Sequence, residues 1–221
     1  IADTLSEAKS IWNLCEQNKL NVQVGFIERY NPAIQQLKKV LDQSRKVVNI
    51  DFVRTNKISK RITDVDVIID LMIHDIDLAL HLNGPIQSVS AHGFVEYEMI
   101  DYASVLLTHT NGHFSRIQAS RITEKKTRSI QATCVDMYVD CDLLRKEIII
   151  NRQTESFQKS NGPYVISSFE ETVEIQPQEA LLTELQAFIL SCSGSDIDKP
   201  NALDGLEAMR VCDEIQRKIL K

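Results

Sequence analysis

About six strand-like segments follow one another between residues 86 and 175, and this run constrains the fold more than any other feature of the sequence. Apolar and polar residues alternate along most of them, as expected of strands that bury one face. Asn111-Gly112 separates two segments and is the strongest short-range signal for a β-hairpin. The segments are residues 86–97, 101–110, 113–120, 128–141, 145–152 and 167–175.

Two helix-like segments close the chain, over about residues 177–194 and 203–220. A run of strands followed by helices is typical of an α+β domain with a largely antiparallel sheet. Such a sheet buries one face against helices and leaves the other face available for a partner. We therefore predict an open sheet of about six strands packed with helices.

The beginning of the chain has a different character. Thr4-Leu5-Ser6-Glu7 has the pattern of a capping box and predicts a helix that ends near Asn18. Residues 21–27 are interpreted as a short buried strand, and Asn31-Pro32 predicts the start of a second helix. Residues 47–55 alternate and predict another strand. A helix–strand unit is thus expected ahead of the sheet domain.

Residues 66–85, DVIIDLMIHDIDLALHLNGP, place ionisable side chains within an apolar run. Their steps of four, four, three and four residues predict one polar stripe on a helix. The stripe consists of Asp66, Asp70, His74, Asp77 and His81.

Solvated helix faces are usually rich in Lys, Glu, Gln and Arg, which are good helix formers, whereas this stripe contains only Asp and His. It therefore favours a buried helix whose short polar groups face a cleft. Asp70 and His74 are one turn apart, so the carboxylate can orient the imidazole. A solvated face and a metal site built from Asp70, His74 and His81 are the alternatives. No cysteine or second histidine pair at ligand spacing supports the metal site.

Composition excludes several classes of protein. The net charge of −6 and the short basic segments do not indicate a nucleic-acid partner. The five cysteines are widely spaced without a CxxC motif, which fits reduced thiols and predicts a cytoplasmic protein. The most apolar run, residues 65–82, contains six ionisable residues and is not predicted to span a membrane. No G-x-G-x-x-G is present, so a complete dinucleotide-binding unit is not expected within this chain.

Three sequence blocks resemble the glucose–fructose oxidoreductase/inositol dehydrogenase (Gfo/Idh/MocA) family. They are VGFIERYNPAI, DLMIHDIDLALHLNG, and the pair EALLTELQAFI and DGLEAMRVCDEI. The resemblance implies a Rossmann domain followed by an α+β domain with a broad open sheet. It implies that residues 1–27 are a remnant of the dinucleotide-binding domain and that residues 28–221 form the substrate-binding and oligomerisation domain. The family's Glu-Lys-Pro motif, with its lysine, is expected just before Ile1.

The resemblance also implies roles for individual residues. His74 matches the family's general acid/base on the substrate hydroxyl, and Asp70 matches the carboxylate that orients it or binds a sugar hydroxyl. Arg29 and Asn31 match a turn beside the cofactor, and Tyr30 matches a position beside the substrate. For these three residues a structural role is nearly as good an interpretation, because Asn31 can cap a helix. The implied cofactor is NAD or NADP, bound mainly by the missing domain, and no metal is implied.

Three interpretations of function follow. The leading one is the substrate-binding domain of an NAD(P)-dependent oxidoreductase that acts on a hydroxyl of a sugar, nucleotide-sugar or cyclitol. The second is a non-catalytic domain that binds a sugar or dimerises without a cofactor. The third is a metal-dependent lyase or isomerase that uses Asp70, His74 and His81. A homo-oligomer is predicted through the open sheet, on the basis of its alternating apolar residues. These residues include Val105, Leu107, Phe114 and Ile117.

Overall fold

The computed structural model describes residues 2–57, 65–158 and 164–221. Its helical elements are α1 (Leu5–Asn18), η1 (Ile27–Tyr30), α2 (Pro32–Asp42), η2 (Ile68–Met72), α3 (Ile73–Asn83), α4 (Ala180–Cys192) and α5 (Ala202–Ile219). Its strands are β1 (Val47–Lys57), β2 (Ile86–Glu96), β3 (Met99–His109), β4 (Phe114–Ser120), β5 (Ile122–Cys134), β6 (Tyr138–Asp142), β7 (Glu147–Gln158) and β8 (Tyr164–Val173). No helix in these ranges is long and apolar enough to span a bilayer.

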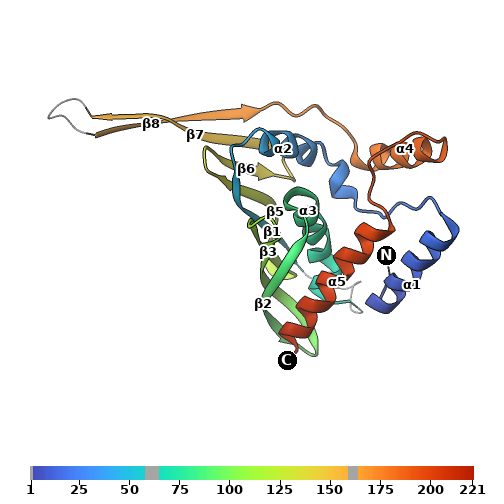
Figure 1. Cartoon of the computed structure of the whole chain (residues 1–221). Coiled ribbons are helices and arrows are strands. Elements are labelled where there is room, and N and C mark those ends of the chain that lie inside the picture. The colour runs from blue at the N-terminus through green and yellow to red at the C-terminus, as the bar shows by residue number, and fades with distance from the viewer. Residues whose placement is uncertain (1, 58–64, 159–163) are drawn as a thin grey trace.

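The strands form one mixed sheet of eight in the order β2-β3-β4-β1-β5-β6-β7-β8 (Figure 1). Only β1 and β4 pair in parallel, and the other neighbours are antiparallel. The α+β class is confirmed, but the prediction of about six strands is wrong. Residues 128–141 are not one strand, because the Cys134 N–H donates to the Met137 carbonyl at 2.8 Å and closes a turn between β5 and β6.

The predicted strand over residues 21–27 is also wrong. The Val24 N–H donates at 2.9 Å to the carbonyl of Pro200, just ahead of α5, and not to a neighbouring strand. The Phe26 N–H then turns back to the Val24 carbonyl at 2.8 Å, and the chain enters η1. The unit before the sheet domain is therefore a helix followed by an extended segment, which brings Glu28 and Arg29 beneath α3.

The helices lie on one side of the sheet, and the other side carries no helix in Figure 1. Val105, Leu107 and Ile117 are at most 1% exposed, so they face the helices and form the core. Their assignment to an oligomerisation surface is wrong, because alternation fixes two opposite faces without saying which one the helices cover. Of the four residues proposed for that surface, Phe114 alone is exposed, at 39%.

Asp66 sets the start of the striped helix. Its Oδ1 accepts hydrogen bonds from the N–H groups of Ile68 and Ile69 at 3.0 and 3.1 Å. The first turn, η2, is a π-helix in which the Ile73 N–H donates to the Ile68 carbonyl, five residues back. The regular helix α3 follows and ends at Gly84, whose φ of +85° favours glycine. Asp70 therefore lies in the π turn, whereas His74, Asp77 and His81 lie in the regular α-helix that follows.

Candidate functional site

Arg29 joins η1 to α3 and α5. Its Nε lies 2.9 Å from Asp77 Oδ2, and its Nη2 lies 2.6 Å from Asp77 Oδ1 and 3.0 Å from Asp204 Oδ1. The Arg29 and Asp77 side chains are 9% and 1% exposed. Burial alone would lower the pKa of Arg29, but its hydrogen bonds and charge interactions with Asp77 and Asp204 raise it. We call Arg29, Asp77 and Asp204 the Arg29 cluster; it has the character of a structural ion-pair network.

A second network, the Arg54 cluster, consists of Glu28, Arg54, Asp75 and Arg128. Arg54 donates from Nε and Nη2 to the two Asp75 oxygens, both at 2.8 Å, and from Nη1 to Glu28 Oε1 at 3.0 Å. Arg128 Nη1 reaches the same Glu28 oxygen at 3.3 Å. Burial alone would raise the pKa of Glu28, yet Arg54, Asn31 and Arg128 hold it below its usual value. Charges of alternating sign thus link α3, β1, η1 and β5.

His74 lies beside the Arg54 cluster. Its side chain is half-buried, and its Nδ1 is buried without a hydrogen-bond partner in the described part of the chain. Burial, followed by the charge of Arg54, lowers the pKa of His74, while Asp75 and Glu28 act in the opposite direction. A neutral imidazole with an unused ring nitrogen can accept a proton or a hydrogen bond.

Asp70 lies in η2, within the π turn, and is half-buried. Two of the other predicted site residues make contacts of their own. Arg29 belongs to its own cluster, and Asn31 accepts from the Ala33 N–H at 3.1 Å as the cap of α2. The Asn31 amide also donates to Glu28 at 3.2 Å. The structure therefore brings His74 next to Glu28 and Arg54, and it gives Arg29 and Asn31 structural contacts.

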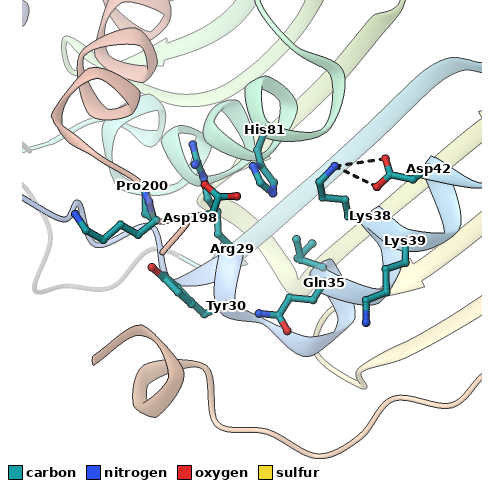
Figure 2. Close-up of a pocket in the computed structure, with 11 residues that line it drawn as sticks. Arg29, Tyr30, Gln35, Lys38, Lys39, Asp42, His81, Asp198 and Pro200 are labelled. Carbon is teal, nitrogen blue, oxygen red and sulfur yellow. Dashed lines mark hydrogen bonds and ion pairs between the residues drawn. The ribbon is translucent and has the colours of Figure 1, made fainter. Parts of the chain in front are cut away.

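Tyr30 and His81 line a pocket of about 380 Å³ between α2, α3 and residues 198–200 (Figure 2). Neither Asp70 nor His74 lines this pocket. The Tyr30 hydroxyl is buried without a hydrogen-bond partner among the described residues, and burial with the charge of Glu184 raises its pKa to about 12. At neutral pH it is a hydroxyl that can donate to a ligand.

The two side chains predicted to contact the cofactor are engaged within the chain. The Arg29 and Asn31 side chains, the two predicted cofactor contacts, already use their groups on Asp77, Asp204, Glu28 and the start of α2. No group of three or more His, Cys, Asp or Glu side chains that could hold a metal ion occurs within the described ranges. Among the described side chains, His74 offers hydrogen bonding and proton transfer beside the charges of the Arg54 cluster.

Glu28, Arg54 and Arg128 were not predicted as site residues. The sequence does contain a signal for Arg54. Its side chain points to the same face of β1 as those of Ile50 and Phe52, which are 0 and 1% exposed. An arginine at such a position needs buried anions as partners. The sequence does not say which acids those are, because Glu28 and Asp75 come from distant segments.

Comparison with known proteins shows what this chain is similar to. Residues 48–137 match the family model described as GFO/IDH/MocA C-terminal domain. The UDP-N-acetylglucosamine 3-dehydrogenase of Acidithiobacillus ferrooxidans is 27% identical over 209 residues, which are 93% of this chain. The match spans 63% of the length of that curated relative.

Solved structures agree on the fold. A structure of the Acidithiobacillus ferrooxidans enzyme superposes with a TM-score of 0.85 at 24% identity, covering 98% of this chain and 68% of that one. A levoglucosan dehydrogenase in complex with NADH and L-sorbose gives a TM-score of 0.82 at 15% identity, covering 99% and 69%. Both likenesses extend over nearly all of the present chain.

Proposed function

We propose that this chain is the substrate-binding part of an NAD(P)-dependent oxidoreductase of the Gfo/Idh/MocA family, acting on a sugar, nucleotide-sugar or cyclitol hydroxyl. The observation that carries the proposal is His74, a half-buried imidazole beside the Arg54 cluster whose Nδ1 has no hydrogen-bond partner among the described residues. The relative named for UDP-N-acetylglucosamine and the neighbour bound to NADH and L-sorbose support this class of substrate and cofactor.

In this proposal His74 takes the proton of the substrate hydroxyl. Its lowered pKa leaves the imidazole neutral at pH 7 and ready to accept a proton. The acid form that results would share its surroundings with Asp75 and Glu28, whose charges favour it. Asp70, in the preceding turn, would bind a second hydroxyl or orient the ring. A nicotinamide supplies the redox chemistry.

The cofactor would be held outside the described residues, because Arg29 and Asn31 are engaged elsewhere. We propose accordingly that residues 1–27 adjoin a dinucleotide-binding domain and that residues 28–221 form the substrate domain. Sequencing the coding region upstream of Ile1 tests this division directly. A G-x-G-x-x-G motif and a Glu-Lys-Pro motif are expected there, and an initiator codon directly before Ile1 would favour the non-catalytic interpretation instead.

The enzymatic test compares two histidines on the same helix. In the protein that includes the upstream domain, His74→Ala is expected to lower turnover by about 10²-fold or more, as loss of a general base does. His81→Ala removes an imidazole two turns away, in the pocket of Figure 2, and is expected to keep most of the turnover. Reduction of NAD or NADP is followed by absorbance, first with UDP-N-acetylglucosamine. Equal turnover of His74→Ala and the unaltered enzyme would reject the role of His74.

The uncovered face of the sheet supports a homo-oligomer as a further part of this proposal. Leu106, Phe114 and Tyr138 are 45, 39 and 37% exposed, and each alternates along its strand with buried residues. We propose that these exposed apolar side chains belong to an interface with a second copy of the chain. A light-scattering mass equal to one chain at micromolar concentration would contradict this part alone.

A further inference from the structure

Two arginines lie side by side on neighbouring strands of the sheet. Arg54 of β1 and Arg128 of β5 are directly paired in the antiparallel register. Like charges in directly opposite positions destabilise a sheet. Glu28 lies against both and relieves the repulsion, since its Oε1 is 3.0 Å from Arg54 Nη1 and 3.3 Å from Arg128 Nη1. This arrangement explains how the pair is tolerated but not why the second arginine is present.

The two arginines differ in how many of their donors are used. Arg54 bonds through Nε, Nη1 and Nη2, and its side chain is 3% exposed. Arg128 makes a single polar contact among the described residues, through Nη1, and its side chain is 37% exposed. A guanidinium has five N–H donors in a planar fork. Most of the Arg128 fork is therefore available to a ligand.

Arg128 is not an ordinary surface arginine. Its side chain shares the phase of β5 with Ile130 and Ala132, which are buried against the helices, so it lies on the same side of the sheet as His74. Arg128 contacts Glu28, Glu28 contacts Arg54, and Arg54 contacts Asp75, which follows His74 in α3. A cationic fork with donors to spare thus lies on the same side of the sheet as His74, whose Nδ1 has no partner among the described residues, within a chain whose net charge is −6.

We propose that Arg128 is a specificity residue that binds an anionic group, a carboxylate or a phosphoryl group, on the sugar that His74 acts on. Arginine suits this task because its fork matches the oxygens of either anion with two parallel hydrogen bonds. The identity of the ligand as a sugar rests on the function proposed above. Glu28, which holds Nη1, would fix the direction in which Nε and Nη2 point.

The test is a ligand titration of this chain, followed by NMR of the His74 imidazole and the Arg128 Nε–H. The probes are glucose, glucuronate and glucose 1-phosphate. Both anions, or one of them, should bind about tenfold or more tightly than glucose, as expected for charge-assisted hydrogen bonds. The anion with the greater preference identifies the group as carboxylate or phosphoryl. Arg128→Gln should remove the preference, and Arg128→Lys should keep part of it, because an ammonium retains the charge without the fork.

The matched control is Arg116→Gln, which removes the same charge from an arginine that is 63% exposed and paired with Asp51. It should retain the preference for the anion. An unaltered chain that shows no preference, or an Arg128→Gln chain that behaves like Arg116→Gln, would overturn the proposal; a dispersed amide spectrum verifies folding in each case. The enzymatic test of His74 is independent of this result: loss of the role of His74 with the anion preference intact would reject the proposed function alone.

Discussion

The Arg29 cluster and the Arg54 cluster both tie η1 to α3, yet they differ in how completely their charges are used. In the Arg29 cluster one arginine satisfies two carboxylates, and Asp77 is 1% exposed. In the Arg54 cluster the chain of charges ends in Arg128, which is 37% exposed and makes one contact. Glu28 and Arg29 are adjacent residues of one short helix, yet they belong to different networks. Arg29 belongs to a closed network, in which its donors are used, and Glu28 belongs to an open one, in which Arg128 keeps donors to spare.

The difference teaches where a ligand can act. A buried ion pair that is fully satisfied offers nothing to a ligand, and its removal is a matter of stability. An ion pair whose edge keeps donors without a partner in the described part of the chain, beside an imidazole whose Nδ1 has none there either, can still form bonds when a ligand arrives. Replacing Arg29 should therefore mainly lower stability, whereas replacing Arg128 should mainly weaken ligand binding.

The largest expected effect is the loss of stability when the buried arginine of either network is replaced. Arg29→Met would leave Asp77 buried without its partner, and Arg54→Met would do the same to Asp75, while Glu28 would keep Asn31 and Arg128. Each change should lower the free energy of unfolding by about 3–5 kcal/mol, measured by urea denaturation. The double change Arg29→Met with Asp77→Leu should recover much of the loss. A cost well under about 1 kcal/mol for either single change would contradict the structural role.

An intermediate effect is expected in the pH dependence of stability. Burial and then Arg54 lower the pKa of His74 below its usual 6.5, so the unfolded chain takes up this proton more readily than the folded one. The stability that this histidine contributes is complete above about pH 6.5 and is lost as the pH falls below it. The urea midpoint should drop on acidification, and His74→Gln should make the drop smaller.

The other histidines make the comparison between variants necessary. Burial lowers the pKa of His81, His109 and His113 as well, so acid weakens the unaltered chain through several groups. The contribution of His74 is therefore the difference between the two pH profiles. Parallel profiles for His74→Gln and the unaltered chain would show that its imidazole is not desolvated.

The smallest expected effect on stability belongs to Arg128. Its partner Glu28 keeps the contacts to Arg54 and Asn31, so Arg128→Gln leaves no buried charge alone. We expect a cost of at most about 1 kcal/mol, the range of half-exposed ion pairs, by the same urea measurement. A loss as large as that of Arg54→Met would show that the Arg54 cluster is as closed as the Arg29 cluster.

Local signals in the sequence predicted much of the fold. The capping box at Thr4 and Glu7 is present, Asn31 caps α2, and the Asn111-Gly112 turn joins β3 to β4. Each of these depends on residues within one turn of chain, where sequence spacing fixes geometry. The failed strand over residues 21–27 depended on a partner far along the chain, since Val24 bonds to Pro200.

The candidate site shows the same limit. The spacing of residues 66–81 identified a polar helix face, and His74 lies on it, half-buried and unpartnered. The spacing gave no indication that Asp75 and Asp77 pair with different arginines, because those partners come from β1 and η1. The sequence could not show which acidic residue pairs with which arginine, because the segments that carry them meet only in the folded chain.

The π turn at the start of α3 has a consequence for how this site can change. It holds one residue more than an α-helical turn would, just where Asp70 precedes His74. Deleting a single residue between Asp70 and His74 would restore the regular pitch and leave the segments on either side close to their present directions. Asp70 and His74 would then be three residues apart instead of four, so the direction of one side chain relative to the other would change. Chain length at this turn, and not only residue identity, therefore sets which hydroxyls of a ligand the two side chains can reach together.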